Sequence, residues 1–129
     1  LKACRRTSVQ KSLRRRSMSF GPHDYLAHIL DECEFLHRSS AGMSCEAFLA
    51  DPVLRRACQR SLEIIGEAAK KVDDSFKASH PSLPWRDMAA MRDRLIHGYF
   101  GVDDAIVWDV MQRHIPPLLD ELRHLFERE

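Results

Sequence analysis

The feature that most constrains the fold is a long stripe of apolar and small residues within residues 52–76. Its members recur at helical spacing: Leu54, Ala57, Cys58, Ser61, Leu62, Ile65, Ala68, Ala69 and Val72. Asp51 and Pro52 form a strong start signal, because aspartate caps a first turn and proline fits the first helical position. Gly66 costs about 1 kcal/mol relative to alanine inside a helix, a cost that is usually offset where another helix approaches closely. We therefore predict a central packing helix from Pro52 to about Phe76.

The other patterned stretches are also helical. We expect a helix from Pro22 to about Ser39, a short helix capped by Ser44 that runs through Ala50, a helix from Trp85 to His97, and a last helix that Asp103 caps and that Pro116 and Pro117 must kink or break. No β pattern, repeat or low-complexity tract competes with these helices. The predicted fold is an all-α antiparallel bundle of four to five helices.

Length and composition favour one soluble globular domain. The chain has 129 residues, of which 44% are hydrophobic and 30% charged, and it contains no apolar run long enough to span a membrane. Its four cysteines lack Cys-x2-Cys spacing, and at least three of them fall in predicted helices, where we interpret them as small buried hydrophobes. We therefore expect a reducing cytoplasm as the location. The histidines of the first helix lack the i, i+4 pairing of a metal site, and we expect neither a metal nor another cofactor.

Charge is distributed unevenly along the chain. Residues 1–17 hold seven Lys or Arg and no acid, whereas residues 18–129 hold 13 basic and 19 acidic residues. We interpret residues 1–17 as an extension outside the fold, with a basic arm for nucleic acid or a partner as the alternative, and residues 18–129 as the helical domain. An acidic body disfavours non-specific nucleic-acid binding, so any RNA contact must come from a local basic cleft.

Chemically useful side chains are concentrated in one short stretch, Met91 to Phe100. His97 is expected near a helix C-terminus, where the helix dipole favours the protonated imidazole. Asp93, four residues earlier, lies on the same face and can hydrogen-bond the ring. Arg92 supplies a planar guanidinium that suits phosphate. A proton-transfer group beside a phosphate clamp is the pairing that phosphodiester cleavage needs.

These residues also carry a family resemblance. The spacing Arg92-x4-His97-x-Tyr99 resembles the motif of HepT toxins, small all-helical ribonucleases of the HEPN superfamily that pair with MntA-type minimal nucleotidyltransferase antitoxins. Further segments follow the family pattern in the family order over roughly residues 19–126: Tyr25-Leu26-x2-Ile29-Leu30, Ile64 to Ala68, Pro84-Trp85, and Tyr99 to Asp103 through Trp108. The resemblance implies an HEPN-like fold, a homodimer, and the toxin role of a type VII-like toxin–antitoxin pair. It also implies that Tyr99 accepts AMP groups from the antitoxin.

The expected activity is metal-independent cleavage of RNA by an endoribonuclease. Arg92 and His97 are the predicted catalytic residues, Asp93 is the predicted orienting residue, and Tyr99 is the predicted modification site. One histidine cannot easily both remove the ribose 2′-hydroxyl proton and protonate the leaving oxygen. A two-fold homodimer that places two Arg92/His97 sets across one cleft supplies both groups.

Two other function classes fit the sequence less well. The chain can be a non-catalytic binding module in which Arg92 holds a nucleotide phosphate for a nucleotidyltransferase partner. A purely structural interaction subunit explains the acidic body but not the clustered motif. Glu67, in the long central helix, is interpreted as a solvated or salt-bridged flank rather than as a catalytic acid.

Overall fold

The computed structural model describes residues 20–95 and 103–128. These residues form seven helices and no strand: α2 (Pro22–Ser40), α3 (Cys45–Leu49), α4 (Pro52–Lys71), α5 (Asp74–Ser79), α6 (Trp85–Leu95), α7 (Asp104–Arg113) and α8 (Ile115–Arg128). The all-α prediction is confirmed. The expected count of four to five helices is too low for the described residues, because two of the predicted helices are each divided in two. The extension 1–17 lies outside the described residues.

Local capping signals set most of the helix starts. The side chains of Ser44, Asp51 and Asp103 accept hydrogen bonds from backbone N–H groups in the first turns of α3, α4 and α7, as predicted. Pro116 and Pro117 lie in the first turn of α8, just after His114 ends α7. The predicted break at these prolines is therefore confirmed. Within the described ranges, no helix combines the length and apolarity that crossing a bilayer requires.

The prediction that the central helix continues to about Phe76 is wrong. Helix α4 ends at Lys71, and Val72 is extended. Asp73 then starts α5, since its carboxylate accepts a hydrogen bond of 2.8 Å from the backbone N–H of Phe76. Asp73, one residue past the last buried position of the stripe, is a new N-cap, and it competes successfully with continuation of the helix.

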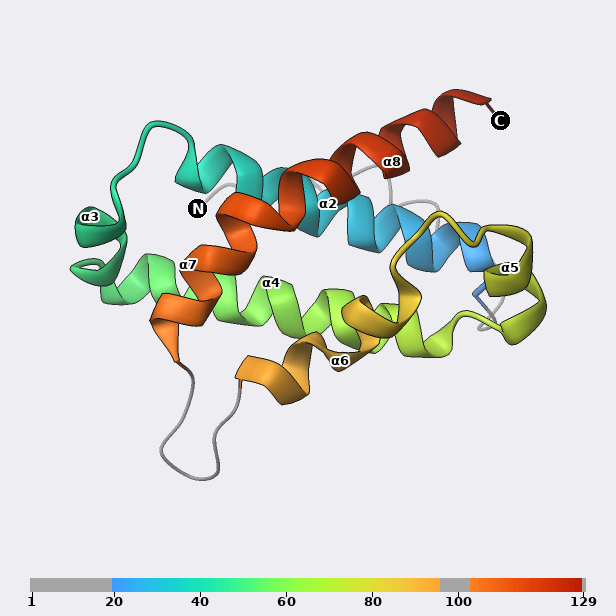
Figure 1. Ribbon diagram of the computed structural model, residues 1–129, viewed down its shortest axis with the longest axis horizontal. Coiled ribbons are helices and arrows are strands. Elements are labelled where there is room, and N and C mark those ends of the chain that lie inside the picture. The colour runs from blue at the N-terminus through green and yellow to red at the C-terminus, as the bar shows by residue number, and fades with distance from the viewer. Residues whose placement is uncertain (1–19, 96–102, 129) are drawn as a thin grey trace, which may run out of the picture.

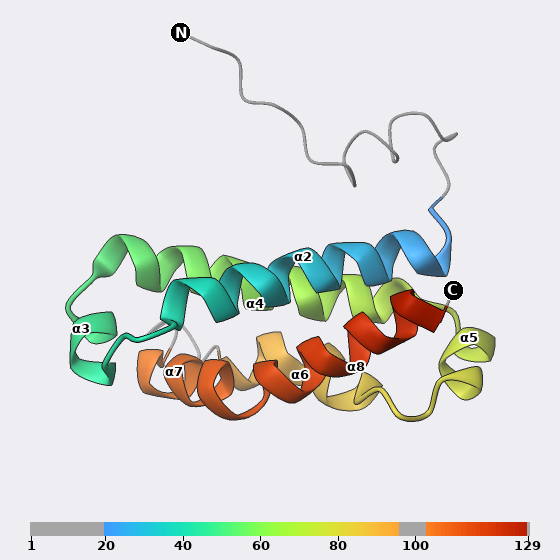
Figure 2. The same ribbon diagram turned by 90° about the horizontal axis from the view of Figure 1, so that it is seen from above.

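The four longest helices, α2, α4, α6 and α8, each run antiparallel to the helices beside them (Figure 1). α4 packs against α2 on one side and against α6 on the other, and α8 packs against α2 (Figure 2). Three of the four seams of this bundle are therefore closed by direct helix contact. The fourth seam, between α6 and the α7–α8 arm, is held by fewer contacts.

The core fills the space between these helices. Fully buried members come from α2, α4, α6, α7 and α8 and include Leu26, Ile29, Leu36, Leu62, Ile65, Met88, Leu95, Met111, Ile115 and Leu122. Burial raises the pKa of the Cys33 thiol to about 12 and that of Cys58 to about 11, so both stay protonated at neutral pH. The interpretation as small buried hydrophobes is confirmed for Cys33 and Cys58, whereas Cys45 is only half-buried.

Gly66 lies where α4 and α6 approach each other closely. A Cβ atom placed on this glycine would lie 3.2 Å from the carbonyl oxygen of Met88 and 3.7 Å from the backbone nitrogen of Arg92. Both neighbours are backbone atoms, which cannot swing aside as a side chain can. The predicted close approach at Gly66 is confirmed, and the neighbouring helix is the one that carries Arg92.

Substituting Gly66 by valine should therefore separate the two helices. We expect Gly66→Val to lower the free energy of unfolding by about 1–3 kcal/mol, the usual cost of overpacking. Glu67→Val introduces the same side chain one residue later, where Glu67 is exposed, and should cost no more than about 0.7 kcal/mol. Chemical denaturation followed by circular dichroism measures both. Equal losses in the two variants would contradict the close-packing account.

Candidate functional site

Arg92 lies in the last turn of α6, on the side that packs against α4. Its backbone nitrogen borders Gly66, and its side chain is exposed. None of the ion pairs among the described residues uses its guanidinium. Among the exposed arginines that the structure describes, only Arg60, Arg113 and Arg123 form ion pairs with acidic side chains. A cation held at a helix end with no counter-ion is available for a phosphate.

The residues that should complete the site follow α6 directly. His97 and Tyr99 lie outside the described residues, so their predicted roles and the predicted helix end at His97 remain predictions. The residues on either side of segment 96–102 are described: the backbone N–H of Asp103 donates a hydrogen bond of 3.2 Å to the carbonyl oxygen of Leu95. The end of α6 at Leu95 and the N-cap of α7 at Asp103 therefore lie side by side, one turn beyond Arg92. We call this hydrogen-bonded pair the loop base.

Asp104 ties this point to α4. Its carboxylate accepts hydrogen bonds from the guanidinium of Arg55 at 2.8 Å and from the side-chain amide of Gln59 at 2.6 Å. The Asp104 side chain is only 15% exposed, which shields the pair from solvent. Sequence reasoning missed this cluster because Asp104 stands beside a capping aspartate and its partners are more than 40 positions away. No local signal identifies them.

Two acidic residues singled out in the sequence, Asp93 and Glu67, both lie at the surface. Asp93, the predicted orienting residue, is exposed, and its expected partner His97 is outside the described residues. Glu67 is a surface flank as interpreted, at 3.8 Å from Arg60 and 46% exposed. Among the described residues, no three His, Cys, Asp or Glu side chains group as metal ligands would.

A half-buried carboxylate lies away from the motif, between α2 and α4. Glu32 accepts a hydrogen bond of 3.0 Å from the hydroxyl of Ser61. Burial raises the pKa of Glu32, and burial together with Glu34 raises the pKa of Asp31. Neither group lies on α6 or α7, so the candidate site does not include them.

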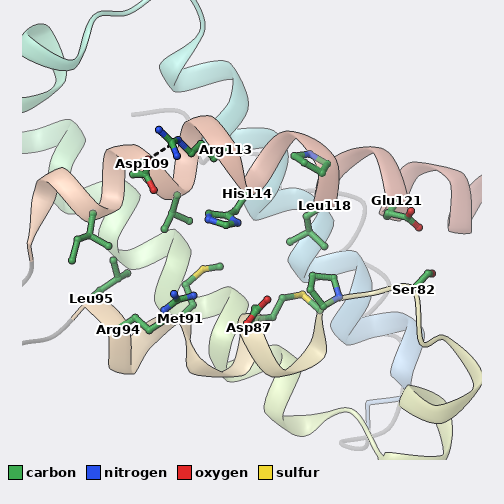
Figure 3. A pocket seen from close by; sticks show the side chains of 15 residues that line it. Ser82, Asp87, Met91, Arg94, Leu95, Asp109, Arg113, His114, Leu118 and Glu121 are labelled. Carbon is green, nitrogen blue, oxygen red and sulfur yellow. Dashed lines mark ion pairs between the residues drawn. The ribbon is translucent and has the colours of Figure 1, made fainter.

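A groove of about 540 Å³ follows the open seam between α6 and the α7–α8 arm (Figure 3). Met88, Met91 and Leu118 are among the apolar residues that line it. Its rim is polarised: Arg94 lies toward one end together with the Arg113–Asp109 ion pair, whereas Asp87 and Glu121 lie toward the other (Figure 3). Arg92 does not line this groove, so α6 presents Arg92 on one flank and the groove on the other.

Comparison with known proteins gives the family. A family model described as ribonuclease HepT-like matches residues 29–125. The chain belongs to the HepT-like ribonuclease family. A relative in Caldanaerobacter subterraneus subsp. tengcongensis, whose name gives RNase as a predicted activity, is 48% identical over 108 residues, which are 84% of this chain and 96% of the relative.

Archaeal members of the family are also similar. A protein of Thermococcus cleftensis named "Probable ribonuclease HepT" is 43% identical over 102 residues, covering 79% of this chain and 93% of its own. A protein of Methanocaldococcus jannaschii, also named as a predicted RNase, is 35% identical over 105 residues, which are 81% of this chain and 84% of the relative. No solved structure matches this chain. The resemblance found in the sequence is thereby confirmed at the level of the family.

The Asp104 cluster gives a stability test. We expect Asp104→Ala to lower the free energy of unfolding by about 1–2 kcal/mol, because Arg55 and Gln59 lose a shielded acceptor. Asp109→Ala breaks an exposed ion pair with Arg113, at 2.9 Å and with side chains 51% and 77% exposed, and should cost no more than about 0.5 kcal/mol. Hydrogen exchange should also become faster at the amide of Asp103 in the first variant only. An unchanged exchange rate there would show that Asp104 does not hold the loop base.

Proposed function

We propose that this HepT-like chain is a metal-independent endoribonuclease with Arg92 and His97 as its catalytic residues. The observation that carries the proposal is the position of Arg92, a cation at the end of α6 that forms no ion pair with the described residues, one turn before a hydrogen-bonded loop base. His97 follows that base by two residues in the sequence. Membership of a ribonuclease family supports the same reaction.

The proposed reaction uses the RNA's own 2′-hydroxyl as the nucleophile. A base removes its proton, the 2′-oxygen attacks the adjacent phosphorus, and the bond to the 5′-oxygen breaks as that oxygen takes a proton from an acid. The products are a 2′,3′-cyclic phosphate and a 5′-hydroxyl, and DNA is inert because it has no 2′-hydroxyl. His97 transfers protons, Arg92 stabilises the charge on the phosphoryl oxygens, and Asp93 orients the imidazole.

Two protonation roles favour a two-fold homodimer, and the groove beside α6 suits a second copy of the chain. Its floor is apolar, and a two-fold axis through it would set the Arg94/Arg113 end of one chain against the Asp87/Glu121 end of the other. Such a self-complementary surface needs no other partner. The groove reaches Leu95 at the loop base, so a chain seated there would border the proposed catalytic cleft.

We further propose the toxin role of a type VII-like toxin–antitoxin pair, with an MntA-type nucleotidyltransferase as the antitoxin partner. AMP added to Tyr99 would bring a phosphate and a base within reach of Arg92 and His97. A tethered group of this kind competes with RNA at a high effective concentration. Modification of one phenol would therefore silence the enzyme.

Variants at the motif test the enzyme against a non-catalytic binding module. Purified protein should cleave RNA in the presence of EDTA. Arg92→Ala and His97→Ala should each reduce the rate by about 10²-fold or more, the usual contribution of such groups, while their helicity is unchanged. Asp93→Asn should lose less, and Arg128→Ala, an exposed residue on α8, should cleave at the parental rate. Parental rates in both motif variants would remove these residues from the chemistry.

A substitution in the groove tests the proposed dimer. Val110 lines the groove and is half-buried, so Val110→Glu should place a charge in the proposed interface without emptying the core. We expect this variant to sediment as a monomer at micromolar concentration and to lose RNA cleavage. Val53→Glu is the control, since Val53 is 78% exposed on α4. A monomeric parent, or a dimeric Val110→Glu variant, would contradict the proposed interface.

Intact-mass measurement tests the modification. Co-expression with the cognate nucleotidyltransferase should add AMP groups to the parent, and Tyr99→Phe should escape them while still cleaving RNA. Tyr25 is the other tyrosine of the chain and is half-buried, with its ring 6.0 Å from that of Phe20. AMP mapped to Tyr25, or no AMP at all, would leave Tyr99 without this role.

A further inference from the structure

We infer that the RNA backbone lies along the seam between α4 and α6 and that Lys70 and Arg86 bind a phosphate next to the one that Arg92 holds. The inference rests on the proposed ribonuclease function. Neither residue belongs to the Arg92-x4-His97-x-Tyr99 motif, and both are exposed. They would bind substrate without taking part in proton transfer.

Basic charge is concentrated on these two helices. Among the described residues, α4 and α6 carry eight Lys and Arg against four Asp and Glu, whereas the rest carries five against fourteen. These two helices therefore carry a net positive charge on an otherwise acidic body. This is the local basic surface that an acidic protein needs if it binds RNA, because phosphate neutralisation supplies most of the sequence-independent affinity.

The close contact at Gly66 fixes which of these charges meet at the seam. Gly66 lies level with Met88 to Arg92 on α6, and the two helices run antiparallel (Figure 1). Lys70 is four residues after Gly66 and therefore lies on the same side of α4, one turn along. Arg86 is three residues before Ala89, whose carbonyl oxygen also borders Gly66. Antiparallel packing thus brings Lys70 and Arg86 to the same level on opposite sides of the seam.

These two cations have no counter-ion among the described residues. The ion pairs on α4 instead involve Arg55, which binds Asp104, and Arg60, which lies at 3.1 Å from Glu63 and 3.8 Å from Glu67. Arg60 therefore offsets the two acidic residues of α4 that would otherwise repel RNA. Two like charges at one level of a helix pair are unfavourable alone and become favourable when an anion lies between them.

The spacing along α6 suits a continuous strand. Arg86 and Arg92 are six residues apart, which is about 9 Å of helix rise and about 120° around the helix, with Ala89 between them. Ala89, midway between them, has a small side chain, and its carbonyl oxygen borders Gly66. A strand whose scissile phosphate sits at Arg92 can therefore present a neighbouring phosphate to Lys70 and Arg86.

A charge-reversal pair with a matched control tests the seam. The test variant is Lys70→Glu/Arg86→Glu, and the control is Lys71→Glu/Arg128→Glu, which changes net charge equally on exposed residues. Lys71 is on the same turn of α4 as Lys70 but about 100° round the helix. The binding probe is fluorescein-labelled single-stranded DNA, which offers the phosphate backbone and cannot be cleaved through a 2′-hydroxyl.

We expect the test variant to bind the DNA roughly tenfold more weakly than the control at about 50 mM salt. The slope of the logarithm of its binding constant against the logarithm of salt concentration should become shallower by about 0.7, the contribution of the one lost phosphate contact. Its KM for RNA should rise while kcat changes little. Equal anisotropy curves for test and control variants would overturn the inference. A parent that leaves RNA intact would instead remove the proposed function, and the DNA titration would still decide whether the seam binds a phosphate backbone.

Discussion

The close approach of α4 and α6 at Gly66 is the constraint on which the candidate site depends. Glycine inside a helix costs about 1 kcal/mol relative to alanine, and here the missing Cβ allows backbone atoms of α6 to approach α4. That contact sets the height and rotation of α6. The direction of Arg92 and the position of Leu95, where the loop base closes, both follow from it. Asp104 fixes the other side of the same base through Arg55 and Gln59.

One short helix separates two proposed contacts. The flank of α6 against α4 carries Arg92, Arg86 lies about 120° further round the helix, and another flank lines the groove with Asp87, Met91 and Arg94. Because these residues differ by their rotation around one helix, substrate and second subunit would meet α6 on different sides. Both contacts converge at the end of the helix, where the motif continues.

Local features of the fold could be predicted from the sequence, since capping and periodicity depend on residues within one or two turns. Ser44, Asp51 and Asp103 cap helices as expected, and Gly66 marked a close approach without naming the partner helix. The break before α5 was missed because apolar periodicity continues past Lys71 and outweighs a single aspartate in a sequence pattern. The Asp104 cluster and the groove arise from segments far apart in sequence, so only packing reveals them.

The chemical ends of the cleaved RNA test the central claim most directly. The account predicts that purified protein in EDTA produces fragments with a 2′,3′-cyclic phosphate or its hydrolysed phosphate on one side and a 5′-hydroxyl on the other, as read by mass spectrometry. A substrate with a single 2′-deoxy sugar at the cleaved position should stay intact. Fragments with a 5′-phosphate, or cleavage of the deoxy substrate at the same position, would contradict attack by the 2′-hydroxyl.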